Sequence, residues 1–237
     1  GQPASQRRAR DGRRAAAGRR QAGAEIAQGM KPPSLQLVLD LPHREALGRD
    51  DFFVTASNAS AVAMIDMWPN WPARQVLLCG PPGSGKTHLA EVWRQRSNAQ
   101  EIEASALSFE AAPQLLAGRA LVIENAAAGK IDERVLFHVI NLARQEEADL
   151  LVTCEKPAEG WNIALPDLAT RLKTFAVVEI GAPDDVLLRA VLVKLFTDRQ
   201  LAASEEVISF LIARMPRSLE AARLLVQDID RRALAEK

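Results

Sequence analysis

One glycine-rich segment constrains the fold of this chain more than any other feature: Gly80-Pro81-Pro82-Gly83-Ser84-Gly85-Lys86-Thr87. It follows an apolar run, Val76–Cys79, and leads into a stretch from His88 that can continue as a helix. A strand, a glycine loop and a helix in this order form a phosphate-binding P-loop, because glycines let successive N–H groups face one anion and the helix N-terminus adds positive charge. We expect Lys86 to reach the β- and γ-phosphates and the Thr87 hydroxyl to bind Mg²⁺. The segment therefore predicts an α/β protein that binds a nucleotide.

A second apolar run ends in Glu124 and Asn125, and both positions bear on hydrolysis. In P-loop proteins the strand facing the P-loop ends in an acid that holds Mg²⁺, a role that Glu124 can take; a surface acid at a strand end is the alternative. Many ATPases place a second acid next, which polarises the attacking water. Asn125 stands there instead, and its amide cannot accept the proton of that water. We therefore expect weak turnover, with Glu124 and Asn125 as the catalytic candidates of this strand.

Thr153 and Glu155 lie at the end of a third apolar run, which starts at Asp149. In open α/β sheets, ligands bind beyond the carboxyl ends of the strands. One of these two side chains can therefore sense the γ-phosphate or its water.

Apolar periodicity and breaks at proline and glycine predict the remaining elements. Further strands are expected near residues 101–104 and 176–180, and helices near residues 59–68, 113–117, 132–147 and 165–172. Beyond the break at Gly181-Ala182-Pro183 the pattern contains helices alone, near residues 184–199, 204–214 and 217–234. This division predicts an α/β domain with a parallel sheet over residues 50–181 and a small helical lid domain over residues 183–237.

The N-terminal part of the chain carries most of the charge asymmetry. Residues 1–29 contain seven Arg, one Asp and one Glu, a net charge of +5, so the remainder carries −5 within a neutral chain. The folded part is therefore not a basic nucleic-acid binder by composition. Residues 1–33 have almost no large apolar side chains and are expected to form a disordered basic tail, which either contacts nucleic acid non-specifically or has no role. Met30 can serve as an initiator, in which case residues 1–29 do not belong to the protein in the cell.

Residues 34–42 contain a short apolar peptide between the tail and the first predicted helix. Gln36 is followed by Leu37, Leu39 and Leu41, and an extended chain projects these leucines to one side. A tethered peptide of this kind suits a linear docking motif. A strand packed on its own domain is the equal alternative.

Cys79 and Cys154 both fall within apolar, strand-like runs. Neither their spacing nor their setting suggests a metal site or a disulfide framework, so buried small hydrophobic side chains are expected. No apolar run approaches the ~18 residues of a membrane span, and no signal-peptide core is present. A cytoplasmic compartment without a membrane partner is the resulting expectation.

These features together resemble the DnaA branch of the AAA+ ATPases over roughly residues 50–237. The P-loop continues as Gly-Lys-Thr-His-Leu, as in that branch, and Phe53-Val54 with Ser57-Asn58 is similar to a segment that lines its adenine pocket. The resemblance implies that ADP or ATP binds together with Mg²⁺, which Thr87 and Glu124 would hold. It also implies nucleotide contacts from a larger set of residues: Gly80–His88, Phe53, Asn58, Glu155 and Arg217.

Within that branch the chain is most similar to the Hda group, short homologues of DnaA that act in its regulatory inactivation. Gln36–Leu41 resembles the Gln-Leu-x-Leu-x-Leu peptide by which this group docks on the sliding clamp, with Asp40 where proline is frequent. Asn125 also matches the group. Leu165–Leu172 is very similar to the segment that carries its arginine finger, which assigns that role to Arg171; a structural salt bridge is the alternative for this residue.

Three further positions are interpreted through the family pattern. Arg217 falls where the lid arginine of the family, sensor 2, contacts the nucleotide. Glu155 stands where members often carry Asp. Glu124 also replaces the usual Asp and is one methylene longer, so the sequence leaves its Mg²⁺ geometry open.

The resemblance implies a negative regulator of chromosomal replication initiation. Such a protein docks on the DNA-loaded sliding clamp, the beta subunit of DNA polymerase III, through Gln36, Leu37, Leu39 and Leu41. It contacts DNA only indirectly, joins the nucleoid through the replisome, and donates Arg171 to the ATP bound by DnaA. An autonomous AAA+ ATPase, such as a helicase loader, is the alternative. A replication initiator is disfavoured, because the chain ends soon after Arg217 and leaves no room for a helix-turn-helix domain. The active nucleotide state and homo-oligomerisation stay open.

Overall fold

The fold is described from a computed structural model of the whole chain. The structure describes residues 53–127, 129 and 131–235, with side chains as far as residue 233. Two predicted segments lie outside the described residues: the basic tail, residues 1–33, and the docking peptide, residues 34–42, with Gln36, Leu37, Leu39 and Leu41.

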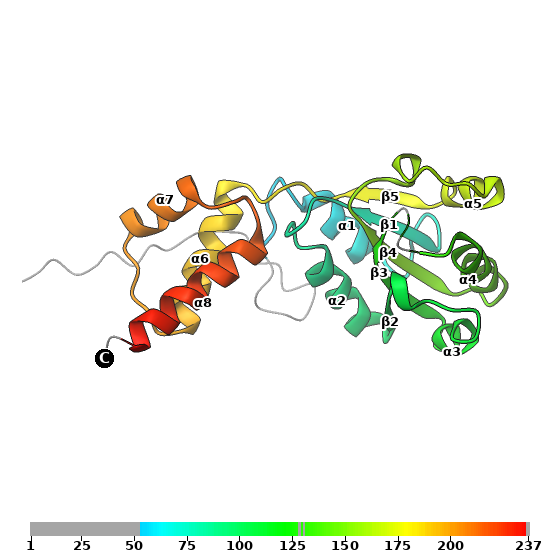
Figure 1. Cartoon of the computed structure of the whole chain (residues 1–237), viewed down its shortest axis with the longest axis horizontal. Coiled ribbons are helices and arrows are strands. Elements are labelled where there is room, and N and C mark those ends of the chain that lie inside the picture. Colours follow the sequence, from blue (N-terminus) through cyan, green and yellow to red (C-terminus); the bar gives the residue numbers. More distant parts are fainter. Residues whose placement is uncertain (1–52, 128, 130, 236–237) are drawn as a thin grey trace, which may run out of the picture. The chain divides into compact units, whose positions relative to one another are not determined.

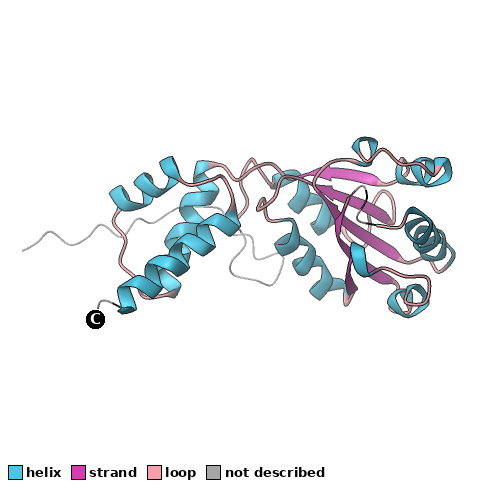
Figure 2. Cartoon of the chain, in the orientation of Figure 1, coloured by secondary structure: helices cyan, strands magenta, loops and turns pink. Residues whose placement is uncertain are grey.

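A parallel sheet of five strands organises the described chain (Figure 1, Figure 2). Its strands are β1 (Gln75–Cys79), β2 (Gln100–Glu103), β3 (Ala120–Ala126), β4 (Asp149–Cys154) and β5 (Ala176–Glu179). They pair in the order β2-β3-β4-β1-β5, and each neighbouring pair is parallel. Every residue of β1 and β4 is buried, as expected for strands covered on both faces. The five predicted strands and the predicted α/β class are confirmed.

Helices cover both faces of this sheet (Figure 1). α1 (Ala59–Met67) and α2 (Lys86–Ser97) cover one face, and α3 (Ala112–Leu116), α4 (Glu133–Gln145) and α5 (Pro166–Leu172) cover the other. Two short 3-10 turns, η2 (Ala104–Ala106) and η3 (Ala158–Gly160), complete the connections. Because side chains alternate along a strand, Val76 and Leu78 join the core beneath α1 and α2, while Leu77 joins the core beneath α4.

Three helices follow the sheet in the sequence: α6 (Asp185–Asp198), α7 (Glu205–Arg214) and α8 (Leu219–Ala235). They share a hydrophobic cluster of their own, which includes Leu192, Ile208 and Val226. The predicted start of α8 at Arg217 is two residues early. Ser218 directly precedes the helix and caps it, because its hydroxyl accepts a hydrogen bond of 3.2 Å from the N–H of Ala221. Whether these helices form a separate domain stays a prediction.

The longest of these helices, α8, has 17 residues. It contains several charged residues, among them Glu220, Arg223 and Asp228. Among the residues that the structure describes, no helix is both long and apolar enough to cross a membrane.

Candidate functional site

The P-loop connects β1 to α2 with the backbone that its glycines predict. Gly83 has a φ of 70° and Gly85 a φ of 104°, values that residues with a Cβ rarely adopt. Gly85 immediately precedes α2, whose N-terminus therefore opens toward the loop. Unpaired N–H groups at a helix N-terminus attract anions, so the loop can cradle a phosphate group.

Lys86 and Ser84 supply the polar side chains of this cradle. The Lys86 ammonium donates hydrogen bonds to the carbonyl oxygens of Gly80 (2.8 Å) and Pro81 (3.0 Å), which hold it over the loop. Burial lowers the pKa of Lys86, although Glu155 opposes this shift. The Ser84 hydroxyl is buried and has no hydrogen-bond partner in the described chain. A buried ammonium and an unpartnered hydroxyl at a helix N-terminus fit a phosphate ligand.

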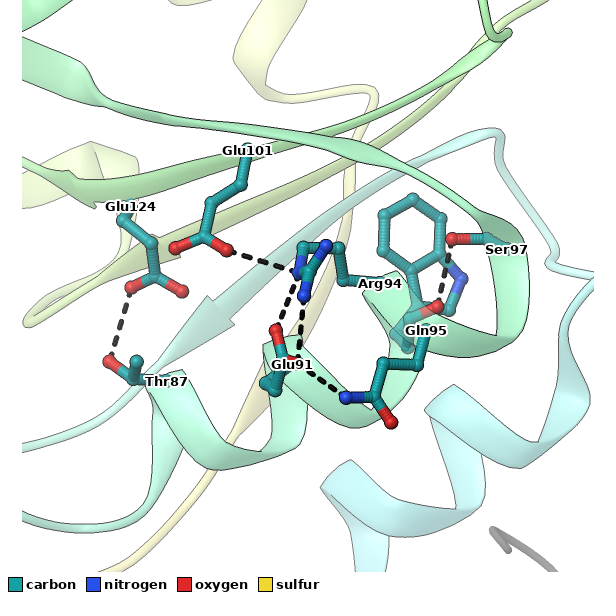
Figure 3. Close-up of polar contacts among 8 residues, drawn as sticks. Thr87, Glu91, Arg94, Gln95, Ser97, Glu101 and Glu124 are labelled. Atoms are coloured by element: carbon teal, nitrogen blue, oxygen red, sulfur yellow. Dashed lines mark hydrogen bonds and ion pairs between the residues drawn. The ribbon is translucent and has the colours of Figure 1, made fainter.

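Glu124 lies within reach of the P-loop helix. Its Oε2 atom accepts hydrogen bonds from the hydroxyls of Thr153 (2.7 Å) and Thr87 (3.3 Å), and the Thr87 contact is visible in Figure 3. Burial raises the pKa of Glu124, while these two hydroxyls partly oppose the shift. The structure therefore brings together the two residues predicted to hold Mg²⁺, a cation that prefers oxygen ligands. The sequence did not place β4 between β3 and β1; Glu124 nevertheless contacts the P-loop helix, because α2 packs over β3 as well as β4.

An ion pair connects the P-loop helix to the edge of the sheet (Figure 3). Arg94 of α2 contacts Glu91 in the same helix (2.5 Å) and Glu101 of β2 (3.3 Å). Solvent-exposed ion pairs of this kind contribute little to stability. Their geometric effect is to hold α2 alongside β2, on the side from which Glu124 approaches Thr87.

Asn125 interrupts the regular end of β3. Its φ is 59°, and the register between β3 and β4 shifts between Ile123 and Ala126. The N–H of Asn125 donates to the Thr153 hydroxyl (2.9 Å), and its side-chain amide donates to Glu103 of β2 (3.1 Å). The position next to Glu124 therefore presents a neutral amide that is tethered to an acid from the neighbouring strand.

A cavity of about 690 Å³ opens above the P-loop. Small-molecule sites commonly have volumes of this size. Predicted residues that line it are Phe53, Asn58, Pro82–His88, Asn125 and Glu155. Gly80 and Pro81 adjoin the lining and contact Lys86 through their carbonyl oxygens. Of the two candidates at the end of β4, Glu155 lines the cavity, whereas Thr153 is fully buried and supports Glu124.

Asn58 shapes the segment that carries Phe53 to the cavity. Its side chain accepts a hydrogen bond from the N–H of Thr55 (2.8 Å) and donates one to the carbonyl of Phe53 (2.9 Å). The Asn58 residue is only 2% exposed. Its amide thus holds the turn before α1, and Phe53 supplies an apolar ring to the cavity.

Part of the cavity wall was missed by sequence reasoning. It comes from α6 and α8: Leu187, Val191, Lys194, Leu195, Leu219, Glu220 and Arg223. In α6 the apolar lining residues recur every four positions, at Leu187, Val191 and Leu195, which places them on one helix face. That spacing could have indicated an apolar helix face. Since a face packed in the core has the same spacing, it could not have shown that these residues line a ligand cavity.

Arg217 does not belong to this wall. Its guanidinium forms an ion pair with Asp185 (2.8 Å) and donates to the carbonyl of Pro183 (3.4 Å). Arg223 lines the cavity instead. The nucleotide role of Arg217 therefore stays a prediction that the geometry of the described cavity does not favour.

Arg171 lies in the last turn of α5 and outside the cavity lining. Throughout the described chain, no hydrogen bond or ion pair engages its guanidinium. The start of α5 is held from α4, because the Glu133 carboxylate accepts hydrogen bonds from the N–H groups of Ala164 (3.0 Å) and Leu165 (2.7 Å). The salt-bridge alternative for Arg171 thus has no partner among the described residues.

Sequence comparisons identify no relative of this chain. No protein-family model matches it, and no curated protein matches it. Its relationships are therefore visible only in the fold.

Solved structures share this fold. A DNA replication initiation factor has a TM-score of 0.65 and 18% identity, over 80% of this chain and 65% of that one. Replication initiator DnaA bound to AMPPCP and single-stranded DNA has a TM-score of 0.61 and 18% identity, over 80% of this chain and 66% of that one. A variant of Thermotoga maritima RuvB has a TM-score of 0.58 and 15% identity, over 78% of this chain and 64% of that one. The chain thus spans just under two thirds of each of these proteins. The described chain therefore has the same fold as these DnaA and RuvB structures.

Proposed function

We propose that this chain is a nucleotide-binding negative regulator of replication initiation, which stimulates hydrolysis of DnaA-bound ATP as the Hda group does. The observation that carries the proposal is the guanidinium of Arg171, which has no hydrogen-bond or ion-pair partner among the described residues and lies on a short helix outside the described cavity. The alternative role of Arg171, a structural salt bridge, would need an acidic partner, and the described residues supply none.

The chain's own ligand would be ADP or ATP. Lys86 and the N-terminus of α2 would bind the phosphates, while Phe53 and the apolar side chains of α6 would contact the base. Mg²⁺, held by Thr87 and Glu124, would neutralise phosphate charge when bound. A fold neighbour, DnaA, was solved with AMPPCP, which supports a nucleotide of this class.

Arg171 would act in trans. Its guanidinium would enter the ATP site of DnaA and stabilise negative charge that develops on the transferred phosphoryl group. An arginine finger contributes roughly 10³–10⁵ to the rate of such a reaction. The chain can therefore accelerate hydrolysis on DnaA while it turns over little ATP itself, in keeping with the neutral amide of Asn125.

Docking on the sliding clamp would use Gln36, Leu37, Leu39 and Leu41. If the peptide is bound in an extended conformation, the alternation in the sequence would present three leucines on one side. The clamp would bring the protein to DNA without a direct contact, and a cytoplasmic, replisome-associated location follows from the same proposal.

An autonomous ATPase is the second candidate, and one observation favours it. The hydrogen bond between the Asn125 amide and Glu103 brings an acid beside the position that usually carries the second acid. If Glu103 can orient water, the chain hydrolyses ATP alone. A Glu103→Gln variant would then lose that activity.

The deciding experiment follows phosphate release from DnaA preloaded with labelled ATP, in the presence of clamp-loaded DNA. We expect wild-type protein to accelerate release many-fold and Arg171→Ala to lose about 10³-fold or more of that acceleration. Lys173→Ala, which removes an exposed cation two residues away, is the matched control and should retain it. No acceleration by the wild-type protein with ADP or ATP would reject the regulator; phosphate release by the isolated chain would then support the second candidate.

A further inference from the structure

Cys79 and Cys154 are the last residues of neighbouring strands, β1 and β4, and they are paired in the sheet register. Both thiols are free, and each residue is 1% exposed, which confirms the prediction that they are buried. Their sulfur atoms lie 3.0 Å apart, and either thiol can donate a hydrogen bond to the other. The two residues are 75 positions apart in the sequence, so only the parallel sheet makes them neighbours.

The pair lies directly beneath the start of the P-loop. Cys79 precedes Gly80, whose N–H donates a hydrogen bond of 3.1 Å to the carbonyl of Cys154. The carbonyl of Gly80 in turn accepts a hydrogen bond from the Lys86 ammonium. Cys154 precedes Glu155, which lines the cavity. A change at the two sulfurs therefore acts on the phosphate cradle and on the cavity wall together.

We propose that Cys79 and Cys154 form a reversible dithiol–disulfide site, which hydroperoxides oxidise and which weakens nucleotide binding when it closes. The effect on nucleotide binding rests on the proposed function, whereas closure of the disulfide does not. Neighbouring strands lie about 4.8 Å apart, within the Cα separations of about 4.4–6.8 Å that disulfides span. The sulfurs need to approach by only about 1 Å to reach bonding distance.

The reaction with hydrogen peroxide balances in two steps. The Cys79 thiolate attacks one peroxide oxygen, which forms a sulfenic acid and releases hydroxide; the thiol proton converts the hydroxide to water. The Cys154 sulfur then attacks the sulfenic sulfur, which forms the S–S bond and releases a second water with the Cys154 proton. Two thiols lose two hydrogen atoms, and one peroxide is reduced to two waters. A thiol reductant reverses the bond by exchange.

The environment assigns different roles to the two thiols. The hydrogen bond with Cys154 lowers the pKa of Cys79, and the same contact, together with burial, raises the pKa of Cys154. Because the thiolate is the nucleophile, Cys79 is the residue that reacts first with peroxide. Cys154 then resolves the sulfenic acid.

Closure would disturb the P-loop because the end of β1 is held on its other side by the segment that follows β5. The N–H of Ile180 donates a hydrogen bond of 2.8 Å to the carbonyl of Cys79. A Cβ placed on Gly80 would overlap the Ile180 carbonyl, so these two segments of the backbone are in close contact. Drawing Cys79 toward β4 therefore pulls Gly80 away from this contact and shifts an acceptor of the Lys86 ammonium.

The test uses the full chain, reduced or treated with hydrogen peroxide that is then removed. We expect oxidised protein to lose two hydrogen atoms in mass and to yield a peptide that links Cys79 to Cys154. Its affinity for fluorescent ADP with Mg²⁺ should fall about fivefold or more, and dithiothreitol should restore it. The Cys79→Ala and Cys154→Ala variants should form no such linkage, and peroxide should leave their nucleotide affinity unchanged.

Each other outcome has a distinct meaning. Two intact thiols after treatment, or added oxygen atoms without a cross-link, would overturn the disulfide site. A cross-link that leaves nucleotide affinity unchanged would overturn its regulatory role. If the reduced protein binds no nucleotide, the proposed function fails, while the mass measurement still decides the disulfide.

Discussion

The hydroxyl of Thr153 on β4 donates a hydrogen bond of 2.7 Å to the Glu124 carboxylate on β3. The same hydroxyl accepts a hydrogen bond from the N–H of Asn125 (2.9 Å). One fully buried side chain therefore orients the proposed Mg²⁺ ligand and stabilises the left-handed backbone of the next residue. Thr153 supports the site from behind, while Glu155, two positions later, faces the cavity.

Glu124 should make the stability of the nucleotide-free protein depend on pH. Burial raises the pKa of Glu124 in the folded state above the ordinary value of 4.5. At a pH between 4.5 and this raised pKa, the folded state therefore holds a proton that the unfolded state has released. The contribution is complete below pH 4.5 and is lost as the pH rises through the folded pKa. We expect Glu124→Gln to remove this loss of stability and therefore to be more stable than wild type at neutral pH.

Urea unfolding of both proteins without nucleotide, across this pH range, measures the difference. The two stability curves should separate as the pH rises. Parallel curves would show that Glu124 does not titrate as proposed. Binding of nucleotide with Mg²⁺ should still be weaker in the glutamine variant, because the ligand charge is gone.

Gly83→Ala should abolish nucleotide binding. The new Cβ would overlap the Ser218 hydroxyl and lie 2.7 Å from its Cβ, at a φ of 70°. It would also disturb the hydrogen bond of 2.8 Å between the Leu219 N–H and the Gly83 carbonyl. Gly129→Ala is the matched control, since Gly129 has a φ of 73° and a Cβ there would meet no atom of the described residues within 4 Å.

Both alanine variants carry the backbone penalty of about 1–2 kcal/mol, and only the first carries the collision. Thermal unfolding measures the shared penalty, and titration with fluorescent ADP measures binding. Equal binding by the two variants would contradict a tight contact between the P-loop and the residues that precede α8.

Glu133 should position the arginine finger. Its carboxylate accepts two N–H groups at the start of α5, so Glu133→Ala should let this helix shift and move Arg171. We expect about a tenfold loss in stimulation of DnaA, because a finger acts only in one geometry. Glu133→Gln should recover part of it, since the amide oxygen can accept one of the two hydrogen bonds.

The phosphate-release assay gives this loss, and nucleotide titration of the same variants tests for general damage. Affinity for ADP should not change, since Glu133 does not line the cavity. Glu146→Ala, which removes an exposed acid just after the same helix, should behave as wild type. A loss of ADP affinity equal to the loss of stimulation would reject the positioning role.

Arg223→Ala should weaken ATP binding more than Arg217→Ala does. Arg223 lines the cavity, whereas Asp185 holds Arg217 at 2.8 Å outside it. Charge-assisted contacts to phosphate contribute about 1.5–3 kcal/mol each, so the expected loss for Arg223 is about tenfold or more. Calorimetric titration of both variants with ATP compares them. A larger loss for Arg217 would mean that the nucleotide draws it away from Asp185, as the family pattern suggests.

The sequence by itself determined the features that depend on local chemistry. Proline, glycine and capping residues end helices wherever they occur, and buried parallel strands require long apolar runs. The P-loop with Lys86 and Thr87, the five strands and the helices that follow them could therefore be predicted. The pairing of Thr87 with Glu124 also followed, since the family pattern already joins these two positions.

Only the tertiary structure decided which distant residues meet. It brought Cys79 against Cys154, tethered Asn125 to Glu103, and made Leu187 part of a cavity wall. It also placed Arg223, rather than Arg217, in that wall. These contacts depend on strand order and on the register between segments far apart in the chain, while a sequence pattern reports only the face on which a residue lies. Thr153 and Glu155 are two residues apart at the end of the same strand. Only the packing around them decides that Thr153 supports the site and Glu155 lines it.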